Sequence, residues 1–256
     1  MLNVNVFSSN LPFIKIVKKN FIIKNIYSDK LVDKNFRIFC NKNSIILKHI
    51  KKKKDLKKTI NKSINLCLVF GFGFIFKENF IKKFQHGILN FHTGDLPRYR
   101  GRHPLTWAFL NDEKKIAMSV HLINKEIDQG YLIHKFFVKR TYKDDLDTIL
   151  DKILLKLDKE IIKIKKKIFH KKKKKLSKGK YFPPLFKGIQ KIQSSNCTSK
   201  FVYNAIKAQK IYGGAKVDGK IYNDVFFYNK KIITNTTNFK ILNFKDKKKL
   251  ILIKKN

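Results

Sequence analysis

Arginine is scarce in a chain that is otherwise crowded with cations. The 256 residues include 59 lysines and arginines, of which only five are arginine, and 18 acidic residues leave a formal net charge of +41. Three of the arginines, Arg98, Arg100 and Arg102, lie in one short stretch, NFHTGDLPRYRGRHP, at residues 90–104. A guanidinium makes paired, planar hydrogen bonds that an ammonium does not reproduce. We therefore expect geometry to matter in this stretch more than charge alone.

Cysteine and long apolar runs are also scarce. The three cysteines, Cys40, Cys67 and Cys197, are odd in number and far apart. This spacing argues against a disulfide framework or a metal cluster, and it predicts a reducing, cytoplasmic location and no metal. The longest apolar runs, such as INLCLVFGFGFIF, are too short or too interrupted by glycine to cross a bilayer, and no secretion-signal pattern is visible. The sequence thus predicts no membrane partner.

The large positive charge has two interpretations. Lysines release counterions from phosphates, which favours a nucleic-acid partner. Alternatively, the charge reflects base composition, because Lys, Asn, Ile and Phe have AT-rich codons and dominate every segment, including the apolar ones. Lysine is spread over the whole chain, which favours the second interpretation, although the sequence leaves both open. Under either one, some non-specific attraction to polyanions follows.

Short apolar runs alternate with stretches compatible with helices through residues 1–135. Their patterns predict strands at residues 4–7, 21–27, 44–50, 64–70, 87–92 and 117–122. Helices are expected at residues 31–40 and 78–84, whereas the helix of the first thirty residues is hard to place. This alternation predicts an α/β fold with a Rossmann-like, mostly parallel sheet and helices on both faces.

A smaller region follows the clearest helix of the chain. Residues 145–170 carry one apolar stripe at helical spacing. The stretches KKKKK at 171–175 and LSKGKYFPP then mark a boundary. Residues 201–208 predict a short helix, and the tail from residue 224 predicts small antiparallel strands. We therefore predict a main domain at residues 1–180 and a small C-terminal α+β domain at residues 181–256.

An amide and an imidazole end the fifth predicted strand, GILNFH. Asn90 and His92 are two residues apart, so both project from one face, at the edge where open α/β sheets bind ligands. Together they can polarise a carbonyl and move a proton, although such pairs also cap strand ends. Asp128, in NKEIDQG after the next strand, could orient His92 or be an ordinary turn residue.

Two glycines follow the fourth predicted strand, in VFGFGFIF. The segment lacks the full G-x-G-x-x-G dinucleotide fingerprint. Gly71 and Gly73 would let a ligand approach the backbone closely, with Phe72, Phe74 and Phe76 as an apolar wall. The alternative is a tight turn packed by aromatic rings.

In their order and spacing these stretches closely resemble the family of formyltransferases that move a formyl group from 10-formyltetrahydrofolate to an amine. The family core reads Asn-x-His, Leu-Pro-x-Tyr-Arg-Gly, a Pro, a helix ending in Asn-Gly-Glu, and Asp-x-Gly. The matching stretch here is LNFHTGDLPRYRGRHPLTWAFLNDEKKIAMSVHLINKEIDQGYLI. Thr93 and Gly94 stand where Pro-Ser is frequent, Asp112 replaces the Gly of Asn-Gly-Glu, and Tyr131 stands where Asp is usual. These departures bear on loop geometry and substrate fit.

The resemblance implies catalytic roles for Asn90, His92 and Asp128. Asn90 and His92 would hydrogen-bond a tetrahedral oxyanion, His92 would take the amine proton, and Asp128 would tune and orient His92. It also implies 10-formyltetrahydrofolate as the formyl donor, bound in the main domain, and no metal. The folate-side residues that we predict are Phe70, Gly71, Phe72, Gly73, Ile75, Asn124 and Ile127.

The resemblance leaves two acceptors. GRHPLTW, KGKYFPP and VYNAIKAQKIYGGA are similar to segments of the sugar-acting branch, which favours a nucleotide-linked amino sugar. The charge would suit a methionyl-tRNA formyltransferase acting on initiator tRNA, and a remote alternative is a non-catalytic family member that binds nucleic acid. We predict Arg100, Arg102 and Trp107 on the acceptor side, with the alternative that Arg100 pins its loop to a helix C-terminus. The oligomeric state is unknown.

Overall fold

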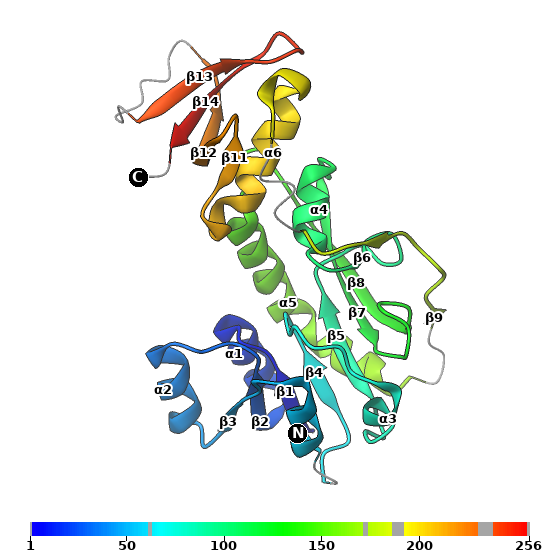
Figure 1. The fold of residues 1–256 in the computed structure, drawn as a ribbon. Helices are drawn as coiled ribbons and strands as arrows, with labels where there is room; N and C mark the ends of the chain where they lie inside the picture. Colours follow the sequence, from blue (N-terminus) through cyan, green and yellow to red (C-terminus); the bar gives the residue numbers. More distant parts are fainter. Residues whose placement is uncertain (1, 61–62, 171–173, 186–191, 230–237, 255–256) are drawn as a thin grey trace. The chain divides into compact units, whose positions relative to one another are not determined.

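The computed structural model describes residues 2–60, 63–170, 174–185, 192–229 and 238–254 (Figure 1). Within these ranges eight strands form one sheet in the order β3-β2-β1-β4-β5-β7-β8-β9. The pairings from β3 through β5 are parallel, whereas β5 with β7 and β8 with β9 are antiparallel. The predicted α/β fold with a mostly parallel sheet is therefore confirmed.

The elements follow the predicted order closely. The sheet strands are β1 (Asn3–Phe7), β2 (Ile22–Ser28), β3 (Ile46–His49), β4 (Cys67–Val69), β5 (Ile88–His92), β7 (Lys115–Leu122), β8 (Tyr131–Lys139) and β9 (Lys174–Lys175). The helices are α1 (Leu11–Asn20), α2 (Lys34–Lys42), α3 (Glu78–Ile81), α4 (Pro104–Leu110), α5 (Leu146–Ile168) and α6 (Ser199–Gln209), with 3-10 turns η1 (Lys53–Thr59), η3 (Ser194–Asn196) and η4 (Lys210–Tyr212). The other strands are β6 (Arg100–Gly101), β10 (Tyr181–Phe182), β11 (Ala215–Val217), β12 (Lys220–Phe227), β13 (Phe239–Asn243) and β14 (Lys249–Lys254).

Helix α1 occupies the region that the sequence pattern left unassigned. The Asn10 side chain accepts the N–H of Phe13 at 2.8 Å, and Pro12 stands in the first turn, so the start carries the usual capping chemistry. Phe13 and Val17 are buried against the sheet. Its β-branched residues Ile14, Ile16 and Val17 give the segment a strand-like composition, which is why it was hard to place.

The two faces of the sheet carry different layers. Phe91 of β5 packs against Phe13 of α1, with ring centroids 5.0 Å apart, whereas Ile88 joins Phe80 of α3 in a separate cluster. Successive residues of a strand point to opposite faces. Asn90 and His92, which are two and four residues after Ile88, therefore lie on the α3 face and away from α1.

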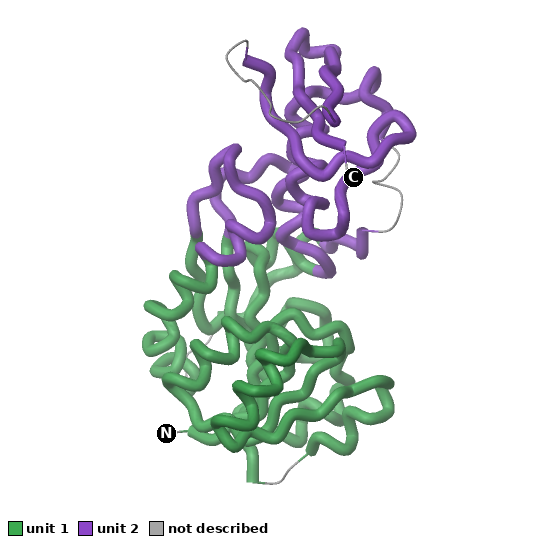
Figure 2. Tube along the Cα trace, turned by 90° about the vertical axis from the view of Figure 1, so that its left-hand side faces the viewer, with its two compact units in different colours: residues 1–100, 117–137, 153–180 green, residues 101–116, 138–152, 181–256 purple. Residues whose placement is uncertain are grey.

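Contacts divide the chain into two compact units (Figure 2). Unit 1 comprises residues 1–100, 117–137 and 153–180, and unit 2 comprises residues 101–116, 138–152 and 181–256. Unit 2 thus gathers segments from both sides of the predicted boundary at residue 180, and that boundary stays a prediction. The lysine run at 171–175 lies partly outside the described residues. Every helix among the residues described is too short or too polar to cross a membrane.

The C-terminal part of unit 2 is a small α+β assembly, as predicted. Strands β11, β12, β14 and β13 pair antiparallel in that order. Helix α6 covers one face, where Val202 and Ile206 pack with Val225, Leu250 and Leu252. The alternation of these apolar positions with polar ones is what made the strands visible in the sequence.

Candidate active site

Two neighbouring strands place four polar side chains on one face of the sheet. In the antiparallel pairing of β5 with β7, Asn90 lies opposite His121 and His92 lies opposite Ser119. Asn90 is half-buried, and the other three are buried. Buried polar groups need hydrogen-bond partners, and each of these four side chains has one.

His92 is held in one tautomer by its own loop. Its Nε2 lies 2.7 Å from the carbonyl oxygen of Tyr99, and because a carbonyl only accepts, Nε2 carries the proton. The other nitrogen, Nδ1, lies 3.9 Å from Oδ2 of Asp128. Burial lowers the pKa of His92, while the Asp128 carboxylate acts in the opposite direction. A neutral imidazole with an unprotonated Nδ1 is therefore the favoured form at neutral pH.

Asp128 bridges two histidines. Its Oδ1 lies 3.4 Å from Nε2 of His121, while its Oδ2 faces His92. Asp128 has a left-handed φ of 54°, a conformation that Asp tolerates better than most residues. A Cβ built on Gly130 would lie 1.6 Å from the carbonyl oxygen of Leu122. Only glycine therefore allows the loop to fold back so closely onto the end of β7, which is where Asp128 meets the strand pair.

His121 belongs to this constellation, and the sequence interpretation missed it. Its Nδ1 lies 3.0 Å from the Leu122 carbonyl, so Nδ1 carries a proton. Its Nε2 lies 3.3 Å from the Asn90 amide nitrogen. With the proton on Nδ1, Nε2 is the acceptor for the Asn90 amide. The available signal was Ser-x-His at strand spacing inside the apolar run AMSVHL.

The loop after His92 is fixed to β7. The Ser119 hydroxyl accepts the N–H of Leu96 at 3.1 Å and donates to the carbonyl of Gly94 at 2.7 Å. The N–H of Tyr99 in turn donates to the Asp95 carbonyl at 3.0 Å. These bonds close the loop back on itself, which brings the Tyr99 carbonyl onto His92.

Arg100 joins the two loops of the site. Its Nε donates to the carbonyl of Ile127 at 3.0 Å, one residue before Asp128, and one terminal nitrogen donates to the carbonyl of Gly179 at 3.0 Å. The side chain is buried, and its planar guanidinium makes both bonds at once from different nitrogens. Both acceptors lie in loops, so the expected anchoring to a helix C-terminus is not what these bonds show. A role for Arg100 toward an acceptor stays a prediction.

The predicted folate-side residues fall into two groups. Phe70 is buried against Phe13, with ring centroids 4.8 Å apart, and Asn124 accepts from Glu126 N–H and donates to the Gln129 carbonyl within its own loop. The remaining residues stand at more open positions. Ile75 and Ile127 are exposed, Gly71 has φ 63° with nothing within 4 Å of a built Cβ, and Phe72 is half-buried.

The loop after β4 is itself tethered. The N–H of Gly73 donates to Oδ2 of Asp29 at 2.7 Å, and a Cβ built at Gly73 would come within 2.8 Å of that oxygen. Ser9 donates to Oδ1 of the same carboxylate at 3.3 Å. The loops that follow β1, β2 and β4 therefore share one carboxylate. Crowding at Gly73 would act first on Asp29.

Arg102 and Trp107 lie in unit 2. Arg102 is exposed, and its N–H donates to the Phe182 carbonyl at 3.2 Å. The indole N–H of Trp107 donates to the Pro183 carbonyl at 2.9 Å, and its ring lies 5.2 Å from that of Phe182. Trp107 thus supports the segment around residues 182–183. Acceptor binding by either residue stays a prediction.

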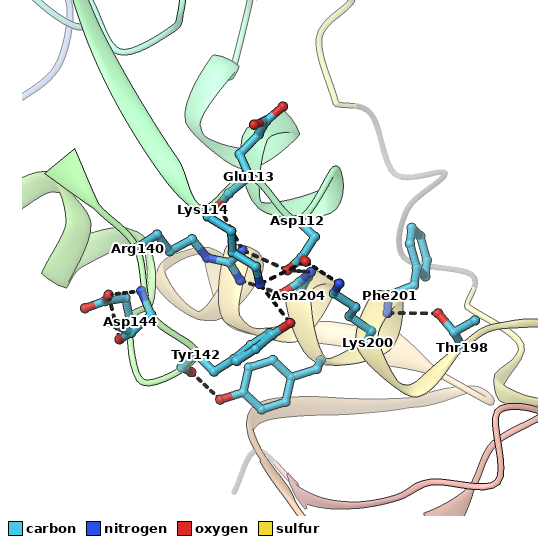
Figure 3. Close-up of polar contacts among 12 residues, drawn as sticks. Asp112, Glu113, Lys114, Arg140, Tyr142, Asp144, Thr198, Lys200, Phe201 and Asn204 are labelled. Carbon is cyan, nitrogen blue, oxygen red and sulfur yellow. Dashed lines mark hydrogen bonds and ion pairs between the residues drawn. The ribbon is translucent and has the colours of Figure 1, made fainter. Parts of the chain in front are cut away.

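A second polar cluster in unit 2 centres on the turn that follows α4 (Figure 3). Asp112, with φ 53°, receives Lys114 at 2.9 Å, Arg140 at 3.2 Å and Lys200 at 2.5 Å, and the Asn204 amide at 3.0 Å. Burial acts to raise the pKa of Asp112, but the hydrogen bonds from Lys200 and Lys114 hold it well below its ordinary value. The carboxylate is therefore ionised and ties α6 to the turn.

In the described parts of the chain, no three His, Cys, Asp or Glu side chains converge in a way that could hold a metal ion. The titratable and amide groups that converge at the site are the Asn90 amide, the imidazoles of His92 and His121 and the Asp128 carboxylate. Such a set can donate hydrogen bonds to a developing oxyanion and accept a proton.

Comparison with known proteins relates the chain to a family and to a fold. The family model described as formyl transferase matches residues 32–163. A methionyl-tRNA formyltransferase of Caldanaerobacter subterraneus subsp. tengcongensis is 32% identical over 88 residues, which is 34% of this chain and 28% of that protein. The match thus spans less than a third of the relative's length.

Solved structures resemble the chain over nearly its whole length. The sugar 3N-formyl transferase WlaRD, solved with dTDP and 5-N-formyl-THF, superposes with a TM-score of 0.75 at 20% identity, covering 100% of this chain and 98% of that one. An N-formyltransferase from Helicobacter canadensis, in complex with folinic acid and dTDP-3-aminofucose, gives 0.74 at 18% identity, covering 99% and 100%. At these identities the likeness establishes the fold.

Proposed function

Because the chain belongs to the formyl transferase family, we propose that it transfers a formyl group from 10-formyltetrahydrofolate to an amine. The observation that carries this proposal is the convergence of Asn90, His92 and Asp128 on one sheet face. His92 Nδ1 faces the Asp128 carboxylate at 3.9 Å, and Asn90 stands two residues before it on β5. This is the set that an acyl transfer to an amine requires, namely a proton acceptor and hydrogen-bond donors for an oxyanion.

We assign a separate task to each group. Bound 10-formyltetrahydrofolate would supply the formyl carbon, and tetrahydrofolate would leave with the proton that the amine gives up. The Asn90 amide donates to the developing oxyanion. His92 accepts the amine proton at Nδ1, since its Nε2 is committed to Tyr99. Asp128 stabilises the imidazolium that results and orients it.

The loop after β4 fits a flat donor beside this site. Val69 of β4 pairs with Asn90 of β5, so the loop at residues 70–75 begins one strand away from the catalytic pair. A side chain at Gly71 would point into open space, and Phe72 stacks on Phe76 with centroids 5.8 Å apart. An open backbone flanked by fixed aromatic rings suits the approach of a planar pteridine.

For the acceptor, the nucleotide-linked amino sugar is the better supported of two candidates. The two structures named above, which the chain covers almost completely, are a sugar 3N-formyl transferase and an N-formyltransferase bound to dTDP-3-aminofucose. The sequence relative named above is a methionyl-tRNA formyltransferase, and a net charge of +41 would suit tRNA. The free thiols of Cys40, Cys67 and Cys197 fit the cytoplasmic location in which either acceptor is expected.

An acceptor panel tests the proposal. Purified protein is incubated with 10-formyltetrahydrofolate and either charged initiator tRNA or several nucleotide-linked amino sugars, and formylated product is measured by mass spectrometry. We expect product with an amino sugar. His92→Ala and Asp128→Ala should each lower the rate by at least about 10², the low end for a positioned acid–base group. Near-normal turnover by His92→Ala would overturn the mechanism, and product with tRNA alone would transfer the assignment to the second acceptor.

A further inference from the structure

We propose that Lys135 is a positioning residue for this reaction, a role that rests on the proposed function. It acts at a distance from the reacting atoms, by clamping the loop that fixes the His92 tautomer. The clamp consists of Lys135 on β8 and Asp95 in the loop at residues 93–99. Neither residue belongs to the motif by which the family is recognised.

Strand alternation brings Lys135 to the catalytic face. Its neighbour His134 pairs with Glu160 of α5 at 3.0 Å, and Lys156 of α5 lies over the ring of Phe136. The side chains on either side of Lys135 thus point to the α5 layer, and Lys135 points to the opposite face. This is the face that carries the polar side chains of β5 and β7.

The ammonium group of Lys135 makes two bonds to the loop. Its Nζ donates to Oδ1 of Asp95 at 2.7 Å, and it also donates to the carbonyl of Leu96. The second carboxylate oxygen, Oδ2, lies 3.3 Å from Nε of Arg98. Less than a quarter of either clamp side chain is exposed, at 23% for Lys135 and 21% for Asp95. Partial burial and a charged donor make such bonds stronger than those of a surface lysine.

The clamp reaches His92 through Asp95. The main-chain carbonyl of Asp95 accepts the N–H of Tyr99 at 3.0 Å, and the Tyr99 carbonyl accepts from Nε2 of His92 at 2.7 Å. Asp95 therefore connects the Lys135 ammonium to the group that decides which ring nitrogen carries the proton. Loosening this loop would free the Tyr99 carbonyl and allow the second tautomer, in which Nδ1 is protonated and unable to accept a proton.

The test compares three variants with the wild type. Lys135→Met keeps the length of the side chain and removes its charge, Lys135→Arg restores a cation, and Lys165→Met is the matched control. Lys165 also donates to a main-chain carbonyl, that of Asn20 at 2.8 Å, but it does so from α5. The readouts are the ¹⁵N NMR shifts of the His92 imidazole against pH, which report its tautomer without substrate, and kcat and KM for formyl transfer.

We expect Lys135→Met to populate both His92 tautomers and to lower kcat at least about tenfold, with little change in the KM for folate, because misplacement rather than binding is affected. Lys135→Arg should recover part of the loss, and Lys165→Met should match the wild type. A single Nε2–H tautomer and unchanged kcat in Lys135→Met would overturn the proposal. Where that variant does not fold, Asp95→Asn is measured with the same two outcomes. If the wild type shows no transferase activity but Lys135→Met still changes the His92 tautomer, the proposed function is refuted and the clamp stands.

Discussion

At the scale of single residues, the environment of His92 leads to a prediction about the pH dependence of the proposed reaction. Burial lowers the pKa of His92, and the Asp128 carboxylate partly offsets that effect. As the proposed general base, His92 would work in its neutral form, so activity would decline only when the pH falls below this lowered pKa. The acid limb of kcat/KM should therefore lie below the ordinary histidine value of about 6.5.

Asp128→Asn tests the direction in which the Asp128 carboxylate shifts the pKa of His92. Removing the carboxylate removes the influence that raises the pKa of His92, so the acid limb should move to still lower pH while the plateau falls. The measurement is kcat/KM against pH for both proteins. An acid limb that stays in place, or that moves to higher pH, would show that another group titrates.

The sequence predicted some of these residues and not others. Asn90, His92 and Asp128 stand in a motif whose spacing is recognisable. His121 and Lys135 were overlooked because their contacts depend on which strands are neighbours and how they are paired, which a single sequence does not display. The four polar side chains of β5 and β7 become one cluster only through the register that sets Asn90 opposite His121.

At the scale of elements, the ion pairs and hydrogen bonds around Asp112 attach helix α6 to the turn after α4 within unit 2. Arg140 is almost fully buried and donates to Asp112 and to Asn204 of α6. Asp112→Asn leaves this guanidinium without a carboxylate, and removing one partner of a buried ion pair costs roughly 3–5 kcal/mol. We expect a loss of that order in urea unfolding at neutral pH, whereas Asp151→Asn, at an exposed site on α5, should have no comparable effect.

The pH dependence of that difference follows from the sign of the shift. The pKa of Asp112 is lower in the folded protein than in the unfolded chain, so its stabilisation is present above about pH 4 and is lost as the pH falls further. Wild type and Asp112→Asn should therefore converge in acid. A constant difference down to low pH would mean that packing, and not charge, is responsible.

The elements themselves were largely predictable. Continuous or alternating apolar runs predicted strands β1 to β5 and β7. The apolar residues at helical spacing predicted α5. Strand β8 was not identified, because Tyr131, His134 and Lys135 interrupt its apolar pattern. His134 and Lys135 have partners on other elements, so tertiary contacts outweigh the local pattern there.

At the scale of the whole molecule, the charge of +41 attracts any anionic acceptor. The two candidates differ in their response to salt. A tRNA that contacts several cations releases counterions at each, so its KM should rise steeply with salt, whereas a diphosphate held by one or two cations should respond weakly. We expect the weak response when the KM for the acceptor is measured from low to physiological salt, with the KM for folate as control. A steep slope with tRNA as substrate would favour the second acceptor.

The antiparallel pairing of β5 with β7 has an evolutionary consequence. The connection between them, residues 93–114, runs through the segment at 101–116 that carries Arg102 and Trp107. Lengthening such a connection costs little, only about 0.6 kcal/mol for each doubling, whereas a slip of one residue in the strand pair would turn His92 away from Asp128. Insertions and replacements can therefore accumulate in the part of the connection beyond Arg100, while the paired strands and the loop at residues 93–100 keep His92 in place. If Arg102 and Trp107 contact the acceptor, as we propose, exchanging that segment would give a lineage a new amine substrate.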